Sequence, residues 1–222
     1  MNIGILTYNK FHQKSYEILA GLKSKKYKKI VLIYSNIKKF KKRDVFFKHR
    51  PNQFKDISIF EIAKKFNLKA ISIKNKKCFE NLDIVLIGGS QLIPKNRIKK
   101  NLILNCHSGL IPQTRGLDSF KWAIMRNQLV GNTLHYINND IDLGTVIHNS
   151  LTKCHPKDNL KQFASRHYKN EVNLLINFEK YLMRGKIMKL KKYPPTMRMP
   201  LKIEKNLINQ FRNSWKQKYI ND

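Results

Sequence analysis

Short apolar runs alternate with amphipathic stretches through the first half of the chain. Apolar residues are nearly continuous over residues 2–7, 29–34, 70–73, 83–87 and 102–105, as expected for strands buried on both faces. Residues 16–23, 60–66 and 119–126 instead carry apolar side chains at spacings of three and four, which predicts helices. This alternation is typical of parallel strands joined by crossover helices, so we expect a doubly wound α/β sheet.

The second half of the chain has a different order of elements. Residues 132–137 and 145–151 flank the polar sequence NNDIDLG and predict a hairpin or a pair of loops. Residues 159–182 have helical spacing, and Gly185 is a suitable stop. KLKKYPPTMRMP then holds three prolines before a short helical pattern at residues 203–219. We therefore predict one domain, residues 1–185, followed by a C-terminal extension, residues 186–222.

The net charge alone suggests a polyanionic partner, but its composition argues against one. The 222 residues hold 45 Lys and Arg against 14 Asp and Glu, a formal charge of +31. Only 9 of the basic residues are Arg, whereas readers of phosphates and base edges favour the Arg fork. The lysines are also spread in short runs, which favours solvated faces over a nucleic-acid surface. A nucleic-acid partner is therefore kept only as an alternative.

The number of cysteines and the hydropathy of the sequence indicate where in the cell the protein is expected. Cys78, Cys106 and Cys154 are odd in number and have no CxxC spacing, so neither a disulfide framework nor a zinc site is predicted. A reducing, cytoplasmic location fits this pattern best. No stretch approaches the roughly 18 consecutive apolar residues of a membrane span, so no membrane association is expected.

The sequence NLILNCHSGLIPQTRG, residues 101–116, takes a buried strand directly into a turn. Asn105 and His107 lie two residues apart, so both side chains face one side of the strand and Cys106 faces the other. Ligands of open α/β sheets bind at the carboxyl ends of strands, where an Asn and a His can donate to an oxyanion. A capping Asn and a structural turn His are the alternative interpretation.

Two carboxylates follow in NNDIDLGTVI, residues 138–147. Asp140 and Asp142 alternate as EF-hand ligands do, yet the turn glycine comes late, at Gly144, and Asn149 stands where a bidentate Glu is needed. A calcium loop is therefore rejected. A plain Asx turn remains as the structural alternative.

Together, NCHSGLIPQTRGLDSFKWAI and GNTLHYINNDIDLGTVI resemble the folate-dependent formyltransferase family, which includes glycinamide ribonucleotide transformylases and the N-terminal domain of methionyl-tRNA formyltransferases. The family hallmark is Asn-x-His, with an Asp about 35 residues later in a D-x-D-x-G loop. Asn105, His107 and Asp142 match it. The resemblance covers roughly residues 1–185 and implies a Rossmann-like formyltransferase fold, with helices on both faces of a mostly parallel sheet.

The resemblance also implies a reaction and a set of site residues. Formyl transfer from 10-formyltetrahydrofolate to an amine passes through a tetrahedral adduct, for which Asn105 and His107 would stabilise the oxyanion and Asp142 would transfer the proton. Glu171 matches an acidic residue that contacts substrate hydroxyls, and no metal is required. The positions implied for the folate and its ordered water are Leu86, Gly88, Gln91, Leu92, Ile93, His135 and Asp140.

Departures from the family pattern narrow the expected substrate. Ser108 stands where the family usually has Pro after the His, and no glycine lies between Gly4 and Gly21 to form the phosphate-cradling turn of the purine-pathway enzymes. Because 40 residues follow Leu182 in this sequence, we do not expect a tRNA-binding barrel like that of the methionyl-tRNA formyltransferases. The chain thus most resembles the small sugar N-formyltransferases, which often carry an Arg-Met-Pro segment like that at 198–200.

We therefore expect an N-formyltransferase that acts on a nucleotide-linked amino sugar. The alternatives are a phosphoribosylglycinamide formyltransferase and a basic nucleic-acid-binding protein on a formyltransferase-like fold. Arg115 has two open interpretations, one structural and one facing a phosphate. The apolar groups of KLKKYPPTMRMP offer a surface for a homodimer.

Overall fold

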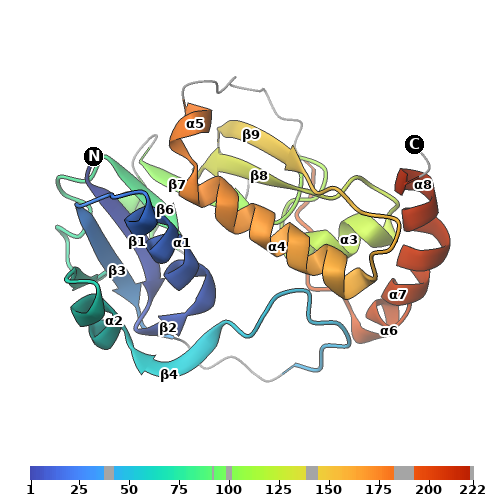
Figure 1. Cartoon of the computed structure of the whole chain (residues 1–222), viewed down its shortest axis with the longest axis horizontal. Coiled ribbons are helices and arrows are strands. Elements are labelled where there is room, and N and C mark those ends of the chain that lie inside the picture. Colours follow the sequence, from blue (N-terminus) through green and yellow to red (C-terminus); the bar gives the residue numbers. More distant parts are fainter. Residues whose placement is uncertain (38–42, 92, 99–101, 139–144, 183–192, 221–222) are drawn as a thin grey trace. The chain divides into compact units, whose positions relative to one another are not determined.

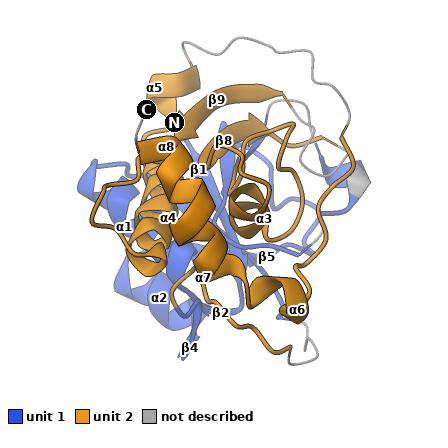
Figure 2. Cartoon of the chain, turned by 90° about the vertical axis from the view of Figure 1, so that its right-hand side faces the viewer, with its two compact units in different colours: residues 1–40, 52–105 blue, residues 41–51, 106–222 orange. Residues whose placement is uncertain are grey.

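The structure is a computed structural model that describes residues 1–37, 43–91, 93–98, 102–138, 145–182 and 193–220 (Figure 1). Its contacts divide the chain into two compact units (Figure 2). The first unit comprises residues 1–40 and 52–105, and the second comprises residues 41–51 and 106–222.

A parallel sheet forms the centre of the first unit. Its strands lie in the order β5-β3-β1-β6-β7, and each neighbouring pair is parallel. The strands are β1 (Ile3–Tyr8), β3 (Ile30–Ser35), β5 (Lys69–Ser72), β6 (Ile84–Ile87) and β7 (Ile103–His107), whose last two residues belong to the second unit. The chain builds outward from β1 to β5 and then returns to β6, so the strand order reverses between β1 and β6. The carboxyl ends of these two strands are where a doubly wound sheet binds ligands.

Two helices of this unit begin with side-chain caps. Helix α1 (Gln13–Ser24) follows His12, whose ring accepts from the Ser15 amide, and its buried face holds Ile18 and Leu22. Helix α2 (Ile59–Lys65) starts with a capping box between Ser58 and Glu61. A single 3₁₀ turn, η1, spans Lys95–Arg97.

A second, two-stranded sheet was not expected from the sequence. Strand β2 (Lys10–His12) pairs antiparallel with β4 (Phe54–Ser58). Only three residues make up β2, and β4 is exposed along most of its length, so neither segment shows a hydrophobic periodicity of its own. Their pairing therefore arises from tertiary contacts.

The second unit combines a hairpin with helices. Strands β8 (Gly131–Tyr136) and β9 (Val146–Leu151) pair antiparallel, which confirms the predicted hairpin. The helices are α3 (Ser119–Met125), α4 (Leu160–Ile176), α5 (Glu179–Leu182), α6 (Leu201–Glu204), α7 (Leu207–Gln210), a π-helical turn (Phe211–Trp215) and α8 (Lys216–Ile220). The helix predicted over residues 159–182 is thus interrupted at Asn177 and Phe178, and the one predicted over 203–219 is made of shorter segments.

Aromatic side chains from distant parts of the sequence form the core of the second unit. Phe120 of α3 and Phe163 of α4 pack in one cluster with Leu207, Phe211 and Trp215 of the C-terminal segments. The C-terminal segments between residues 207 and 219 are therefore part of this core. The predicted boundary at residues 185 and 186 lies outside the described residues, so the sufficiency of residues 1–185 stays a prediction.

The α/β class and the mostly parallel sheet predicted from the sequence are confirmed. Within the described ranges, no helix is both long and apolar enough to cross a membrane.

Candidate active site

Two glycines pack the loop after β6 against strand β1 and the first turn of helix α1. The amides of Gly88 and Gly89 both donate to the Leu6 carbonyl, at 3.1 and 3.0 Å. A Cβ at Gly88 would lie 2.4 Å from Ser15 Oγ, and one at Gly89 would lie 2.6 Å from Tyr8 Cε2. Only glycine allows this approach, which keeps the loop next to the carboxyl end of β1.

Four of the described folate candidates belong to β6 and this loop. Leu86 is completely buried. Gln91 and Ile93 are partly exposed, and Gln91 Nε2 donates to the Asn36 carbonyl. Leu92 lies outside the described residues. The folate roles of Leu86, Gly88, Gln91 and Ile93 stay predictions.

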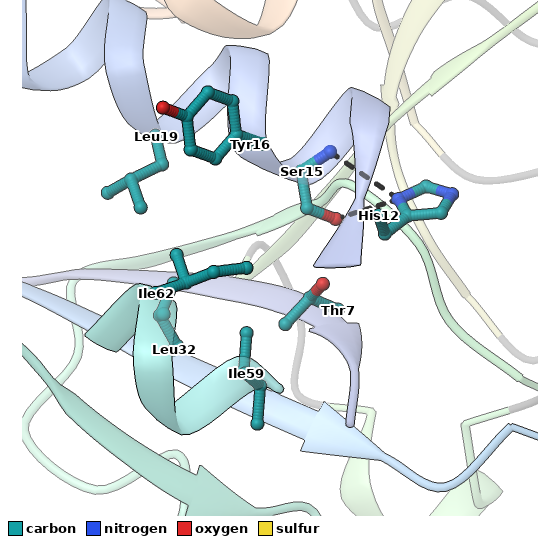
Figure 3. A pocket seen from close by; sticks show the side chains of 8 residues that line it. All are labelled: Thr7, His12, Ser15, Tyr16, Leu19, Leu32, Ile59 and Ile62. Carbon is teal, nitrogen blue, oxygen red and sulfur yellow. Dashed lines mark hydrogen bonds between the residues drawn. The ribbon is translucent and has the colours of Figure 1, made fainter. Parts of the chain in front are cut away.

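A small cavity lies between β1, β3 and the helices α1 and α2 (Figure 3). It measures about 10 Å³ and is lined by Thr7, His12, Ser15, Tyr16, Leu19, Leu32, Ile59 and Ile62. That volume suits one water molecule and excludes a pterin or a sugar. His12 Nδ1 lies 2.9 Å from Ser15 Oγ at the rim and thereby fixes the His12 ring at the start of α1 (Figure 3).

Strand β7 carries the Asn-x-His pair. Asn105 is half-buried and His107 is 7% exposed, and Cys106 between them is buried. Since both polar residues lie within one extended strand, two positions apart, their side chains leave it on the same face. Their catalytic roles stay predictions.

The His107 ring has an assignable tautomer. Nε2 lies 2.8 Å from the Thr114 carbonyl oxygen and 3.0 Å from Ser119 Oγ. A carbonyl oxygen only accepts, so Nε2 carries the hydrogen, and Ser119 donates its own hydrogen to the Gly116 carbonyl at 2.8 Å. In the neutral ring Nδ1 therefore holds the lone pair. This nitrogen can accept a proton from an amine and, once protonated, can donate to an oxyanion.

A close turn after β7 creates these contacts. Thr114 Oγ1 accepts from the Leu110 amide at 2.8 Å, and the Ile111 amide donates to Thr133 Oγ1 at 3.0 Å. A Cβ at Gly109 would lie 2.3 Å from the Thr114 carbonyl oxygen that holds His107. Glycine at position 109 is thus a condition for the observed His107 geometry.

Ser108 bonds to a buried histidine of helix α4. Ser108 Oγ lies 2.9 Å from His167 Nε2, and His167 Nδ1 lies 2.8 Å from Thr152 Oγ1. Burial lowers the pKa of His167 to about 4, despite the opposing effect of Glu171. The ring is consequently neutral at pH 7. A hydrogen bond to α4 thus constrains the position at which the family pattern has proline.

Glu171, the predicted substrate contact, is 1% exposed on α4. Its Oε2 lies 2.7 Å from Arg50 Nη2, so an arginine of the same unit compensates its charge. Neighbouring His49 stacks on Phe120 with ring centroids 5.7 Å apart. Burial and the nearby Arg50 hold the pKa of His49 well below its usual value. The substrate role of Glu171 stays a prediction.

The remaining predicted positions are only partly described. His135 is completely buried on β8, where the register shifts between Leu134 and His135. Asp140 and Asp142 lie outside the described residues. Arg115 Nη1 donates to the Tyr193 carbonyl at 3.0 Å, which supports its structural interpretation. No group of three or more potential metal ligands occurs among the described residues.

Sequence reasoning missed the contacts that hold His107. Thr114 acts through its main-chain carbonyl, which no side-chain pattern reveals, and Ser119 lies 12 positions from His107. His167 was likewise not selected, because it occupies one position among many on an amphipathic helix. No sequence signal distinguished these residues from their neighbours.

Comparison with known proteins gives a match to one protein family and relatives that align with only part of this chain. Residues 1–178 match a family model described as "Formyl transferase". Phosphoribosylglycinamide formyltransferase of Haemophilus influenzae is 23% identical over 110 residues, which are 48% of this chain and 52% of that protein. The chain therefore spans about half the length of this curated relative.

Two solved structures align over almost the entire chain. One is WlaRD, described as a sugar 3N-formyl transferase in the presence of dTDP and 5-N-formyl-THF, with 20% identity and a TM-score of 0.63 over 99% of this chain and 81% of that one. The other is the formyltransferase PseJ from Anoxybacillus kamchatkensis, in complex with UDP-4,6-dideoxy-4-formamido-L-AltNAc and tetrahydrofolate. It has 17% identity and a TM-score of 0.57 over 99% and 98% of the two chains. At these identities the similarity establishes the fold.

Proposed function

The chain belongs to the formyl transferase family, and on this premise we propose that it moves a formyl group from 10-formyltetrahydrofolate to the amine of a nucleotide-linked amino sugar. The observation that carries the proposal is the anchored His107. It lies at the carboxyl end of β7, two residues after Asn105 and inside the segment that the family model matches.

The proposed reaction assigns a task to each end of the His107 ring. The amine nitrogen attacks the formyl carbon, and the carbonyl electron pair moves onto oxygen. Collapse of the adduct breaks the bond between the formyl carbon and N10, and the proton lost by the amine is finally held by N10. Nε2 of His107 stays bonded to the Thr114 carbonyl oxygen. Nδ1, once protonated, would therefore be the nitrogen that donates to the oxyanion. The Asn105 amide would be the second oxyanion donor.

The residues near the β1–β6 reversal suit the folate co-substrate. The loop after β6 offers the partly exposed Gln91 and Ile93 beside a glycine pair that brings its main chain against β1. Main-chain amides and carbonyls recognise the edge of a planar ring well. Asp142 would transfer the proton in this scheme, as the family resemblance implies.

Two features favour a nucleotide-linked sugar as the acceptor. PseJ and WlaRD, solved with a UDP-sugar and with dTDP respectively, align with 99% of this chain. In addition, β1 is followed here by strand β2 instead of a glycine-rich turn that could cradle a lone phosphate. The second candidate is phosphoribosylglycinamide, which the Haemophilus influenzae relative uses according to its name.

Calorimetry followed by an acceptor assay tests the proposal. We expect 5-formyltetrahydrofolate to bind the full chain, and dTDP- or UDP-linked amino sugars to gain one formyl group from 10-formyltetrahydrofolate by mass spectrometry. His107→Ala is the matched inactive control. Formylation of phosphoribosylglycinamide alone would select the second candidate. Absence of folate binding, together with tRNA or duplex DNA binding, would overturn the enzyme proposal.

A homodimer and a cytoplasmic location belong to the same proposal. Sedimentation of the purified chain measures the first, and fractionation of the source cells measures the second.

A further inference from the structure

We propose that Tyr8, His12 and Phe54 form an aromatic platform that stacks the nucleobase of the acceptor nucleotide. The inference rests on the proposed function, since it requires a nucleotide-linked acceptor. It adds the part of the protein that recognises the base, which neither the sequence motifs nor the catalytic residues supply.

The three rings contact one another pairwise. Their centroids are 5.2 Å apart for Tyr8 and His12, 5.3 Å for Tyr8 and Phe54, and 5.3 Å for His12 and Phe54. The two Tyr8 contacts are edge-on, a favourable geometry for aromatic pairs. A cluster in which each ring is held by the other two is ordered before any ligand arrives, which lowers the entropic cost of binding.

The platform lies at the ligand-binding edge of the parallel sheet. Tyr8 is the last residue of β1, and its hydroxyl donates to the Ser90 carbonyl at 3.0 Å in the loop after β6. Gly89 packs directly under the rings, since a Cβ there would lie 2.6 Å from Tyr8 and 2.7 Å from His12. Both strands that flank the order reversal therefore contribute to the support of the platform.

Phe54 presents more of its surface to solvent than either of the two rings that it contacts. It is 47% exposed, whereas His12, its cross-strand partner on β2, is 8% exposed. The exposed Phe54 ring thus rests on the buried His12 ring and the partly exposed Tyr8 ring. Every nucleobase has a planar face that can stack on such a ring.

The charges on the β2–β4 strand pair indicate that this surface binds the nucleobase and not the phosphates of the nucleotide. Lys10 Nζ lies 2.5 Å from Asp56 Oδ1, and Asp56 is two residues from Phe54 on β4. The neighbouring lysine lowers the pKa of Asp56, so the carboxylate is charged at pH 7 and compensates Lys10. A compensated pair attracts a pyrophosphate weakly. Lys55, whose side chain alternates to the other face of β4, lies over the Phe11 ring at 4.9 Å from its centroid. Stacking is therefore the main contribution of the face that carries Phe54.

Titration of UDP, dTDP and GDP into the complex with 5-formyltetrahydrofolate tests the inference. Phe54→Leu keeps the apolar packing and removes the aromatic face, so we expect the Kd of the bound nucleotide to rise about 5- to 150-fold. Phe54→Trp is expected to bind as tightly as the native chain or tighter. Phe60→Ala is the matched control, because Phe60 is 56% exposed in the same unit but contacts Tyr34 and none of the three rings.

The outcomes separate this inference from the proposed function. If a nucleotide binds and Phe54→Leu leaves its Kd unchanged, the platform is wrong and the proposed function stands. If Phe54→Leu weakens 5-formyltetrahydrofolate instead, the rings serve the cofactor and the inference is overturned. If folate binds but none of the three nucleotides does, the nucleotide-linked acceptor and the platform both fail. Retained folding of each variant is checked by its circular dichroism and its melting temperature.

Discussion

Ser108 Oγ and His167 Nε2 lie 2.9 Å apart, which ties the residue directly after His107 to the middle of helix α4. Asn132 Nδ2 donates to the His167 carbonyl at 3.1 Å and Thr152 Oγ1 contacts Nδ1 of the ring, so this histidine is held on several sides. The end of β7 is thereby positioned by a buried hydrogen-bond network.

Asn105→Ala and His107→Ala are each expected to lower kcat about 100- to 1000-fold, because each removes one donor to the proposed oxyanion. Binding of 5-formyltetrahydrofolate, followed by calorimetry, should change far less. Cys106→Ala in the same strand is the control, since Cys106 faces away from both residues and should retain activity. Equal losses in all three variants would assign the effect to folding.

Ser119→Ala is expected to lower kcat about 2- to 10-fold, the usual range for one neutral hydrogen bond. The Thr114 carbonyl still holds Nε2 of His107 in this variant, so KM should stay close to its native value. Ser119 is a positioning residue in this interpretation, and Ser214→Ala, which removes a serine bonded to Asn127, is the matched control. A rise in KM with an unchanged kcat would contradict the role.

A double-mutant cycle of Ser108→Ala and His167→Gln measures the contact that joins β7 to α4. We expect a coupling free energy of about 0.5 to 1.5 kcal/mol in urea unfolding, because the two side chains share a buried hydrogen bond. The cycle cancels the other contacts that His167→Gln loses. Additive effects of the two substitutions would show that the bond contributes nothing to stability.

The free energy of unfolding is expected to fall as the pH drops from about 6.5 toward 4. Unfolded histidine takes up its proton near pH 6.5, whereas burial lowers the pKa of folded His167 to about 4. The unfolded state therefore binds more protons in this window, and each such histidine contributes a slope of up to about 1.4 kcal/mol per pH unit. His49, whose pKa is also lowered by burial, adds to the same trend.

His167→Gln should make that pH dependence shallower by one histidine. Urea unfolding at several pH values between 7 and 4 gives the two slopes. Parallel slopes for the native chain and the variant would mean that His167 takes up its proton equally well in the folded state.

Lys121→Met is expected to destabilise the protein by about 3 to 5 kcal/mol, because it leaves the buried Glu204 carboxylate without its cation. The two side chains are 2% and 0% exposed, and Glu204 Oε2 also accepts from the Phe46 amide at 3.1 Å. Adding Glu204→Gln to this variant should recover part of the loss, since it removes the unpaired charge. Urea unfolding measures both, and a loss below about 1 kcal/mol would contradict the prediction.

Local patterns predicted most of the regular elements. The apolar runs at residues 2–7 and 29–34 correspond to β1 and β3, and the amphipathic stretch at 119–126 corresponds to α3. These segments are buried on a fixed period, so their sequence carries the signal. The motif Asn105-x-His107, read together with its distance to Asp142, likewise led to the family whose model matches residues 1–178.

Contacts between distant residues could not be obtained in this way. Strand β4 is mostly exposed and shows no hydrophobic periodicity. From the sequence alone Phe54 looks like an ordinary surface residue, and only the pairing of β2 with β4 places it beside Tyr8 and His12. Residues 43–51 show the same limitation, because the role of Arg50 appears only when α4 presents Glu171. Packing over the whole unit determines which residues pair, and no short stretch of sequence contains both members of such a pair.

The sequence by itself determined the parallel α/β class, the family and the position of the Asn-x-His pair. Buried strands appear in the sequence as continuous apolar runs, and motif spacings can be counted along the chain. Only the tertiary structure decided that Thr114 and Ser119 hold Nε2 of His107. The reason is geometric: a hydrogen bond requires two atoms within about 3 Å, and the turn after β7 brings these partners together.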